Sequence, residues 1–381
     1  MIRQMLVPLL IAGRKPTPPV LERRFPPEVG AVGLAPGCAF QNEGALWRYR
    51  GVSAFSLPSR YFRGEDPMPF FHWCERIGIN TLRIWPDCSN WVPTDFRTNP
   101  ARDAQLAELL DIGANEGLRF EITCIANWTT PDQDRPIVRR IYDVAAGRWN
   151  VFIEAVNEPW NIGYDVVRLM QGVDRKGILS AYGYNVDAGP NGWETIAALD
   201  YLTPHTPRDL AHYPRNSKDV FEMRSLGYTL VDDEPLGIAD YDKEGSGARS
   251  TDLDAHVSHF GVGAIFNAGE TIHPQCGMEG RPPSADEPIT DHICDMIGQV
   301  WQFIPPDAVS GRYSRNGLGD FPLEVHGNET YDGQGHAYAM IVGNVAYTVV
   351  PKPTPNWQAR PINGWRIDAV GPVPYVLRMV R

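Results

Sequence analysis

The stretch Ile153-Glu154-Ala155-Val156-Asn157-Glu158-Pro159-Trp160 is a short apolar run that ends in Asn-Glu-Pro. A second stretch, Leu230-Val231-Asp232-Asp233-Glu234-Pro235-Leu236-Gly237, is again an apolar run that ends in a carboxylate beside Pro and Gly. Short apolar runs bounded by turn residues are typical of buried β-strands. The sequence therefore predicts two strands, each with a carboxylate at its carboxyl end.

The chain on both sides of these runs alternates between strand-like and helix-like patterns, from about residue 46 to residue 305. We expect strands at 46–55, 80–85, 119–126, 151–156, 178–184, 201–204, 229–233 and 263–267. We expect helices at 67–77, 101–117, 136–146 (with Pro136 in the first helical position), 164–173, 193–199, 218–226, 251–260 and 290–303. Eight strand–helix units in this length predict an α/β fold, a (β/α)8 TIM barrel, which typically needs ~250 residues. In such barrels the functional side chains lie at the carboxyl ends of the strands.

The rest of the chain divides into two further parts. Residues 1–36 form an apolar, proline-rich N-terminal arm, whose run at 5–13 is either a cleaved signal or an ordered segment and is too short to span a bilayer. The barrel, 37–305, begins with a hairpin formed by 38–41 and 46–49. Residues 306–381 form a small β-rich extension, with strands at 336–342, 345–350, 364–370 and 374–380. The arm is a candidate docking segment for an assembly partner, and a secreted, surface or virion-exposed location is favoured over the cytoplasm.

Composition excludes several classes of function. Of the 381 residues, 43% are hydrophobic and 21% charged, which predicts a globular protein with a sizeable core. The net charge of −11, with no long basic run, disfavours a nucleic-acid binder. The six cysteines show no paired spacing, and Cys124 and Cys294 fall in apolar runs that predict small buried side chains. His256 and His259 share a helix face but have no third ligand nearby in sequence, so no metal site or cofactor is expected.

Two carboxylates at the same end of a barrel are what hydrolysis of a sugar bond requires. One carboxyl group donates a proton to the leaving oxygen, and the other attacks the anomeric carbon or activates a water. Glu158 and Glu234 are the candidates, and Arg83, Asn127, His205 and Glu270 fall at the same end of the predicted barrel.

The fourth-strand motif resembles that of the retaining glycoside hydrolases with a (β/α)8 barrel, the clan that includes cellulase-like and mannanase-like enzymes. The resemblance implies that Glu158 is the acid/base and that Asn157 binds the sugar 2-hydroxyl. It implies that Glu234 is the nucleophile, that Arg83 lies beneath it and keeps it ionised, and that His205 is the active-site histidine. We therefore expect hydrolysis of β-linked oligo- or polysaccharides by double displacement.

Two neighbours of Glu234 remain alternatives for the nucleophile. Side chains alternate along an extended strand, so Asp232 and Glu234 are expected on one face and Asp233 on the other. Asp232 would then be an interior polar residue beneath the nucleophile.

The chain departs from the resembled family at two strand ends. His205 is followed by Thr206-Pro207, where relatives often place a tyrosine two residues after the histidine, and Tyr182, Tyr184 or Tyr201 could replace it. The eighth strand lacks the usual tryptophan, and Glu270 is expected to bind sugar hydroxyls instead.

Four tryptophans fall on loops at the expected catalytic face and are candidate sugar platforms: Trp85, Trp91, Trp128 and Trp160. The departures leave a second hypothesis open, a weak or inactive glycan-binding barrel that serves as a module of a larger assembly, such as a virion or a cell-surface complex.

Overall fold

The computed structural model describes residues 28–87, 94–159, 163–185, 199–205, 224, 227–234, 237–238, 249–315, 319–326, 337–351 and 357–381. The predicted helices at 193–199 and 218–226 lie almost entirely outside these residues. Within them, no helix is both long enough and apolar enough to cross a membrane.

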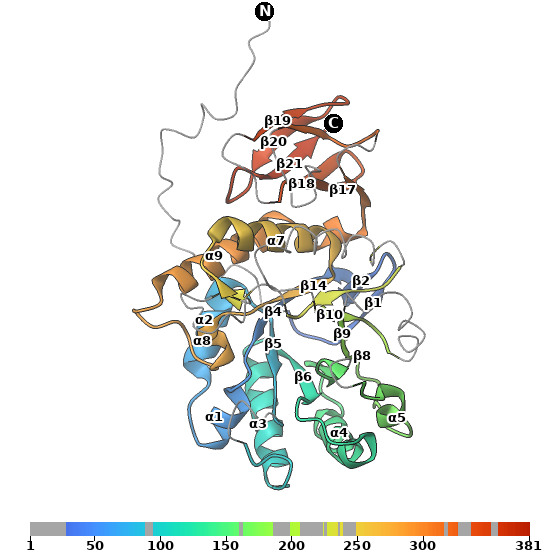
Figure 1. Cartoon of the computed structure of the whole chain (residues 1–381), viewed down its shortest axis with the longest axis vertical. Coiled ribbons are helices and arrows are strands. Elements are labelled where there is room, and N and C mark those ends of the chain that lie inside the picture. Colours follow the sequence, from blue (N-terminus) through green and yellow to red (C-terminus); the bar gives the residue numbers. More distant parts are fainter. Residues whose placement is uncertain are drawn as a thin grey trace, which may run out of the picture.

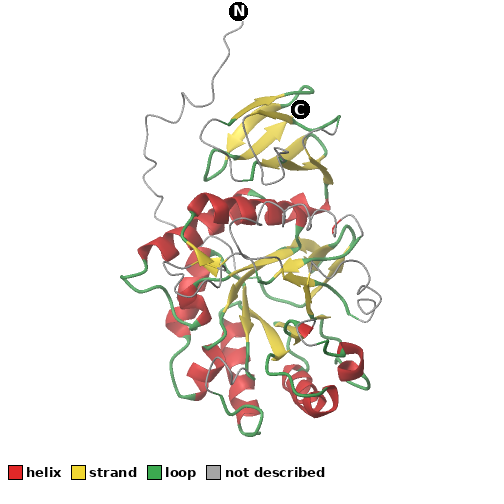
Figure 2. Ribbon diagram, in the orientation of Figure 1, coloured by secondary structure: helices red, strands yellow, loops and turns green. Residues whose placement is uncertain are grey.

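A curled parallel sheet forms the centre of the molecule (Figures 1 and 2). Its strand order is β11-β14-β4-β5-β6-β7-β8. The bounds are β4 (Tyr49–Ser53), β5 (Thr81–Ile84), β6 (Arg119–Ile125), β7 (Val151–Val156), β8 (Ser180–Ala181), β11 (Val231–Asp232) and β14 (Gly269–Ile272). The pairing of β14 with β4 brings late and early parts of the chain together, as in an α/β barrel.

Further parallel pairings continue from the β8 edge. β9 (Gly183–Asn185) follows β8 after one residue and pairs in parallel with β10 (Thr203–His205). An isolated parallel bridge joins Leu202 to Leu230, immediately before β10 and β11. The strands are buried on both faces, which explains why they appear in the sequence as apolar runs rather than alternating patterns.

Helices cover the outer face of this sheet. They are α1 (Leu57–Phe62), α2 (Met68–Ile77), α3 (Arg102–Asn115), α4 (Pro131–Ala145), α5 (Val166–Met170), α7 (Leu253–Phe266), α8 (Gln275–Met278) and α9 (Pro288–Phe303). The expected helices at 67–77, 101–117 and 290–303 are confirmed. α2 shows the reason: Phe70, Phe71, Cys74 and Ile77 recur at helical spacing and are buried, and Gly78 ends the helix in the left-handed conformation.

Two sequence predictions fail around α7 and α4. The eighth strand was expected at 263–267, but these residues extend α7, and β14 begins at Gly269. α7 is buried almost all round, so it has no polar stripe to distinguish its apolar run from a strand. α4 begins at Pro131 rather than Pro136, because the Thr130 side chain accepts from the Gln133 amide and caps the helix there.

A three-stranded antiparallel sheet covers the amino ends of the barrel strands. It consists of β1 (Val32–Ala35), β2 (Ala39–Asn42) and β3 (Ala45–Trp47), so the expected hairpin is confirmed, and β1 lies within the range expected for the arm. Phe40 and Trp47 pack with Tyr49, Phe152 and Tyr201, which lie at or before the starts of strands. These aromatic side chains fill the amino end of the barrel.

The C-terminal residues form a second sheet that is antiparallel, with order β15-β17-β18-β21-β20. Its strands are β15 (Arg312–Arg315), β17 (Tyr338–Val342), β18 (Val345–Val349), β20 (Arg366–Val370) and β21 (Val376–Val380). The sheet packs on α7, away from the barrel (Figure 1). Tyr338 meets Phe266 edge-on at a ring-centroid distance of 5.6 Å, and the Tyr375 hydroxyl donates to Asp254 at 2.8 Å.

Candidate active site

Arg83 is the centre of the site. Leu82 and Ile84 of β5 belong to the apolar core, and the Arg83 side chain, on the alternate face of the strand, is completely buried. Its guanidinium forms ion pairs with Glu154 Oε2 at 2.6 Å, Asp233 Oδ2 at 2.9 Å and Glu234 Oε1 at 2.9 Å. It also donates to Asn157 Oδ1 at 2.9 Å. One cation from β5 therefore joins the ends of β7 and β11.

This arrangement keeps the guanidinium charged. Burial alone would lower the pKa of Arg83, but the carboxylates of Asp233, Glu154 and Glu234 raise it well above its ordinary value. Burial alone would raise the pKa of Glu154, but Arg83 and His205 lower it. The site thus contains a permanent cation beside the Glu234 carboxylate.

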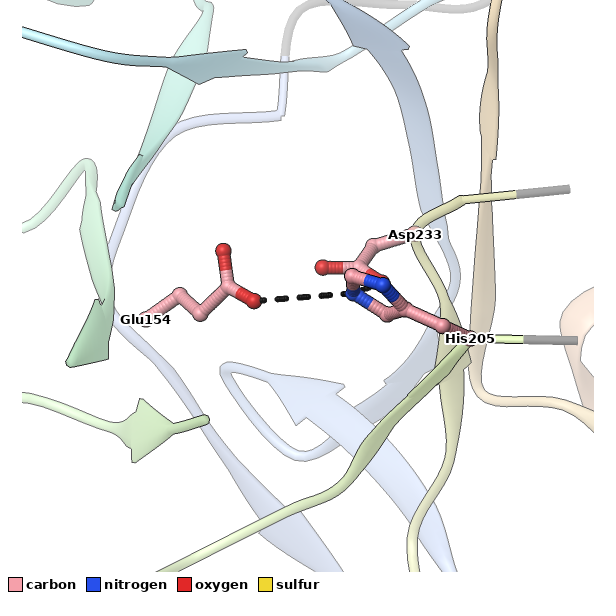
Figure 3. A group of neighbouring side chains, drawn as sticks. All are labelled: Glu154, His205 and Asp233. Atoms are coloured by element: carbon pink, nitrogen blue, oxygen red, sulfur yellow. Dashed lines mark ion pairs between the residues drawn. The ribbon is translucent and has the colours of Figure 1, made fainter. Parts of the chain in front are cut away.

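His205 follows Thr203 and Pro204 at the end of β10 and lies among four carboxylates. Its Nδ1 is 3.3 Å from Glu158 Oε1 and 3.4 Å from Glu234 Oε2. Its Nε2 is 3.2 Å from Asp233 Oδ1 and 3.8 Å from Glu154 Oε1 (Figure 3). Burial lowers the pKa of His205, but Glu234 and Asp233 raise it well above its ordinary value. The ring is therefore held as a cation between two pairs of carboxylates.

Glu158 is the most exposed carboxylate of the site. Its side chain retains 19% exposure, whereas that of Glu234 retains 3%. The backbone of Glu158 adopts the left-handed conformation with φ +46°, a strain of about 1–3 kcal/mol for a residue other than glycine. Such strain persists where the surroundings fix the chain, and it is concentrated at functional sites.

Gly183 allows these groups to meet. A Cβ atom at Gly183 would lie 2.9 Å from the Glu158 amide nitrogen, 3.1 Å from Glu154 Oε1 and 3.1 Å from His205 Nε2. Only a residue without a side chain fits at this point of β9. With this close approach, one oxygen each of Glu158 and Glu234 and one ring nitrogen of His205 lie within 4.8 Å of one another.

Two trios in the site have the spacing of metal ligands: Glu154–His205–Asp233 and Glu158–His205–Glu234. A histidine must give up its ring proton to bind a metal, and the surrounding carboxylates favour the protonated ring. Arg83 already supplies a cation to Glu154, Asp233 and Glu234. Two protein cations, Arg83 and His205, already lie among the four carboxylates of this site, and we assign no metal to it.

The structure brings together five of the residues predicted from sequence: Arg83, Asn157, Glu158, His205 and Glu234. The Asn157 side chain is completely buried, and its amide nitrogen has no hydrogen-bond partner among the described residues. Trp128 lies beside this group, and its Nε1 donates to the Asn157 carbonyl at 2.8 Å. Asn127, the residue before Trp128, donates to the Asp87 carbonyl at 3.3 Å.

The orientation expected for Asp232 is wrong. Asp232 points outward, and His259 Nε2 of α7 lies 2.9 Å from its Oδ2. β11 ends at Asp232, so the alternation of an extended strand does not continue through the next two residues. Asp233 and Glu234 both reach Arg83, and the interior carboxylate beside the nucleophile candidate is Asp233.

The expected contact of Glu270 with substrate is also wrong. Glu270 is completely buried between β14 and the helices, where Trp301 Nε1 donates to it at 3.1 Å. A Cβ atom at Gly263 of α7 would overlap its Oε1, which shows how closely it packs. Burial raises the pKa of Glu270 well above its ordinary value. The error in the position of the eighth strand had placed this residue at a strand end.

Several aromatic residues predicted to contact the sugar or the nucleophile are buried elsewhere in the structure. Trp85 is 1% exposed and packs on Phe55 and the Arg83 guanidinium, so it is not a sugar platform. Tyr201 donates to Glu121 at 2.6 Å instead of to the nucleophile candidate, and Tyr182 is buried in the core. Trp91 and Trp160 lie outside the described residues, as does the side chain of Tyr184.

Two further residues form part of the site although the sequence does not predict this position for them. Glu154 stands in the fourth-strand motif without an expected role, and Asp233 is expected only as an alternative nucleophile. The signal that could have identified them is the excess of carboxylates over cations at the two strand ends.

Comparisons with known proteins support the fold. No family model matches this chain, and no curated protein matches its sequence. Its structure is similar to that of a glycoside hydrolase of family 5 from Bacteroides vulgatus, with a TM-score of 0.58 and 10% identity over 92% of this chain and 93% of that one. It is also similar to an exo-β-1,4-mannosidase from an Opitutaceae bacterium (strain TAV5), with a TM-score of 0.51 and 13% identity over 68% of this chain and 62% of that one. At these identities the likeness establishes a shared fold: the chain has the α/β-barrel fold of family 5 glycoside hydrolases.

Proposed function

We propose that this protein is a retaining glycoside hydrolase that cleaves β-linked glycans by double displacement, in an eight-stranded barrel closed through β9 and β10. The observation that carries the proposal is the placement of one oxygen each of Glu158 and Glu234 within 4.8 Å, at the ends of β7 and β11. Retaining enzymes hold their two carboxyl groups about 5–5.5 Å apart, whereas inverting enzymes leave about 6.5–9.5 Å for a water.

The surroundings of the two carboxylates support different roles. Glu234 is 3% exposed and ion-paired to Arg83, and a nearby cation favours the ionised form that a nucleophile needs. Glu158 is more exposed, at the edge of the site, where it can reach a leaving-group oxygen and later a water.

Asn157 supports the binding of a sugar hydroxyl. Its buried amide nitrogen has no partner among the described residues, and an unsatisfied buried donor costs about 1–3 kcal/mol. A sugar 2-hydroxyl would satisfy this donor, and such contacts strengthen in the transition state. With both carboxylates, Arg83 and Asn157 in place, an inactive glycan-binding barrel is not favoured.

A hydrolysis screen over a glycan panel and aryl β-glycosides tests the proposal. Purified protein should release reducing sugar or aglycone from at least one β-linked substrate, and the Glu234→Ala variant should lose this activity. Inertness of folded protein towards the whole panel, or unchanged activity in Glu234→Ala, would refute it.

A further inference from the structure

A buried Asp–His pair lies beside the two carboxylates of the proposed mechanism. Asp233 Oδ1 is 3.2 Å from His205 Nε2, and the Asp233 side chain is completely buried. The opposite ring nitrogen, Nδ1, faces Glu158 Oε1 and Glu234 Oε2 at nearly equal distances, 3.3 and 3.4 Å. Figure 3 shows the ring beside Asp233, with one ring nitrogen towards Glu154.

We propose that Asp233 is a positioning residue, which holds Nε2 of His205 so that the Nδ1 proton of the ring points at both Glu158 and Glu234. This inference rests on the proposed function, because it assigns an electrostatic role within the same site. Asp233 acts through the imidazole and through Arg83 Nε, 2.9 Å from its Oδ2.

The protonation of Asp233 and His205 decides which nitrogens of the His205 ring carry hydrogen. Burial raises the pKa of Asp233 well above its ordinary value, and the surrounding carboxylates raise that of His205. The pair therefore retains a shared proton at neutral pH. Because the surrounding carboxylates hold the ring as a cation, both ring nitrogens carry hydrogen: the Nε2 hydrogen faces Asp233 Oδ1, and the other hydrogen lies on Nδ1.

The consequence for the two carboxylates follows from charge. The groups that face the ring are Glu154 and Glu158 from β7 and the residues after it, and Asp233 and Glu234 after β11, with Arg83 from β5 beneath. In the Asp233–His205 pair the positive end lies nearer to Glu158 and Glu234, and the negative end lies behind it. A cation at this distance favours the ionised form of a carboxyl group, so the pair keeps the nucleophile ionised towards lower pH.

The Asp233→Asn variant tests this role, because asparagine preserves the shape of the side chain and removes its charge. Because Asp233 is one of the carboxylates that raise the pKa of His205, its loss lowers that pKa, and the acid limb of the kcat/KM profile should move up by about one pH unit, a tenfold loss on that limb. The chain offers a matched control in Asp232, the neighbouring buried carboxylate, which pairs with His259 outside the barrel. Asp232→Asn should leave the pH profile in place.

A second measurement does not depend on activity. Long-range ¹⁵N–¹H correlation spectra of ¹⁵N-histidine-labelled protein report which ring nitrogens carry hydrogen, and His205→Gln assigns the signal. Wild-type His205 should carry hydrogen on Nδ1 at pH 7, and its titration midpoint should fall by more than one unit in Asp233→Asn.

The outcomes separate the two proposals. If the wild-type protein hydrolyses no glycan, the proposed function fails, and the spectra still decide the role of Asp233. An unprotonated Nδ1 in wild-type protein at pH 7 overturns the inference, even if Asp233→Asn does not fold. An unshifted pH profile in a folded, active Asp233→Asn variant also overturns it.

Discussion

Replacing Arg83 by methionine would test the electrostatic core of the site. The guanidinium is completely buried and pairs with Glu154, Asp233 and Glu234 at 2.6–2.9 Å, so its removal takes the main cation from three buried carboxylates. Breaking a buried ion pair from one side costs about 3–5 kcal/mol. We expect Arg83→Met to lower the free energy of unfolding by this amount at pH 7, measured by urea titration with tryptophan fluorescence and circular dichroism.

The stability difference between wild type and Arg83→Met should depend on pH. The folded-state pKa of Glu154 is lowered, so its contribution to wild-type stability is present above its unfolded value of about 4.5 and is lost as the pH falls through the folded value. Without Arg83, burial would instead raise this pKa, and the variant would lose stability as the pH rises above about 4.5. The difference between wild type and Arg83→Met should therefore be larger at pH 7 than at pH 4.5.

A surface pair provides the control. Arg148 pairs with Asp111, whose side chain is 60% exposed, and Arg148→Met should cost no more than about 1 kcal/mol. A loss in Arg83→Met as small as that of the control, or a loss that does not depend on pH, would refute the reasoning.

Three further predictions concern the site and the barrel interior. Gly183→Ala should lower kcat/KM by roughly 10²-fold, because a Cβ atom 2.9 Å from the Glu158 amide displaces the acid/base, while Gly33→Ala, which has open space, should be neutral; equal activities would contradict the assigned packing. Glu158→Gln should slow hydrolysis of unactivated glycans by about 10²–10⁴-fold and affect substrates with good leaving groups less, and a uniform loss in initial-rate assays would argue against an acid role. The pKa of Glu121 is raised by burial to about 7, so its stabilising effect is complete below about pH 4.5 and is lost as the pH rises to 7. Wild-type protein should therefore lose free energy of unfolding as the pH rises from 5 to 8, and in Glu121→Gln this loss should be smaller by about 1–3 kcal/mol. An identical pH dependence in the two proteins would exclude the stabilising effect of protonated Glu121.

Much of the barrel could be predicted from sequence because its strands have strong local signals. Val151–Val156 and Arg119–Ile125 are apolar runs of strand length, and both form strands where expected. The region around α7 could not be predicted in this way, because a helix that is buried all round lacks the amphipathic pattern that separates helix from strand. That single misplacement also explains the wrong role expected for Glu270.

Part of the candidate site could likewise be predicted from sequence, and part could not. Arg83, Asn157, Glu158, His205 and Glu234 were identified from their positions at strand ends, and the structure brings all five together. The role of Asp233 depends on the residue at which β11 ends, and a shift of one residue reverses the face that a side chain occupies. The position of His205 between two pairs of carboxylates depends on distances across the barrel, which no local pattern contains.

The stereochemistry of the released sugar tests the central claim most directly. Proton NMR during cleavage of the best substrate from the glycan panel follows the anomeric signal of the product before it mutarotates. The account predicts that the β-anomer appears first, since double displacement at carboxylates this close retains configuration. First appearance of the α-anomer from a β-linked substrate would contradict it.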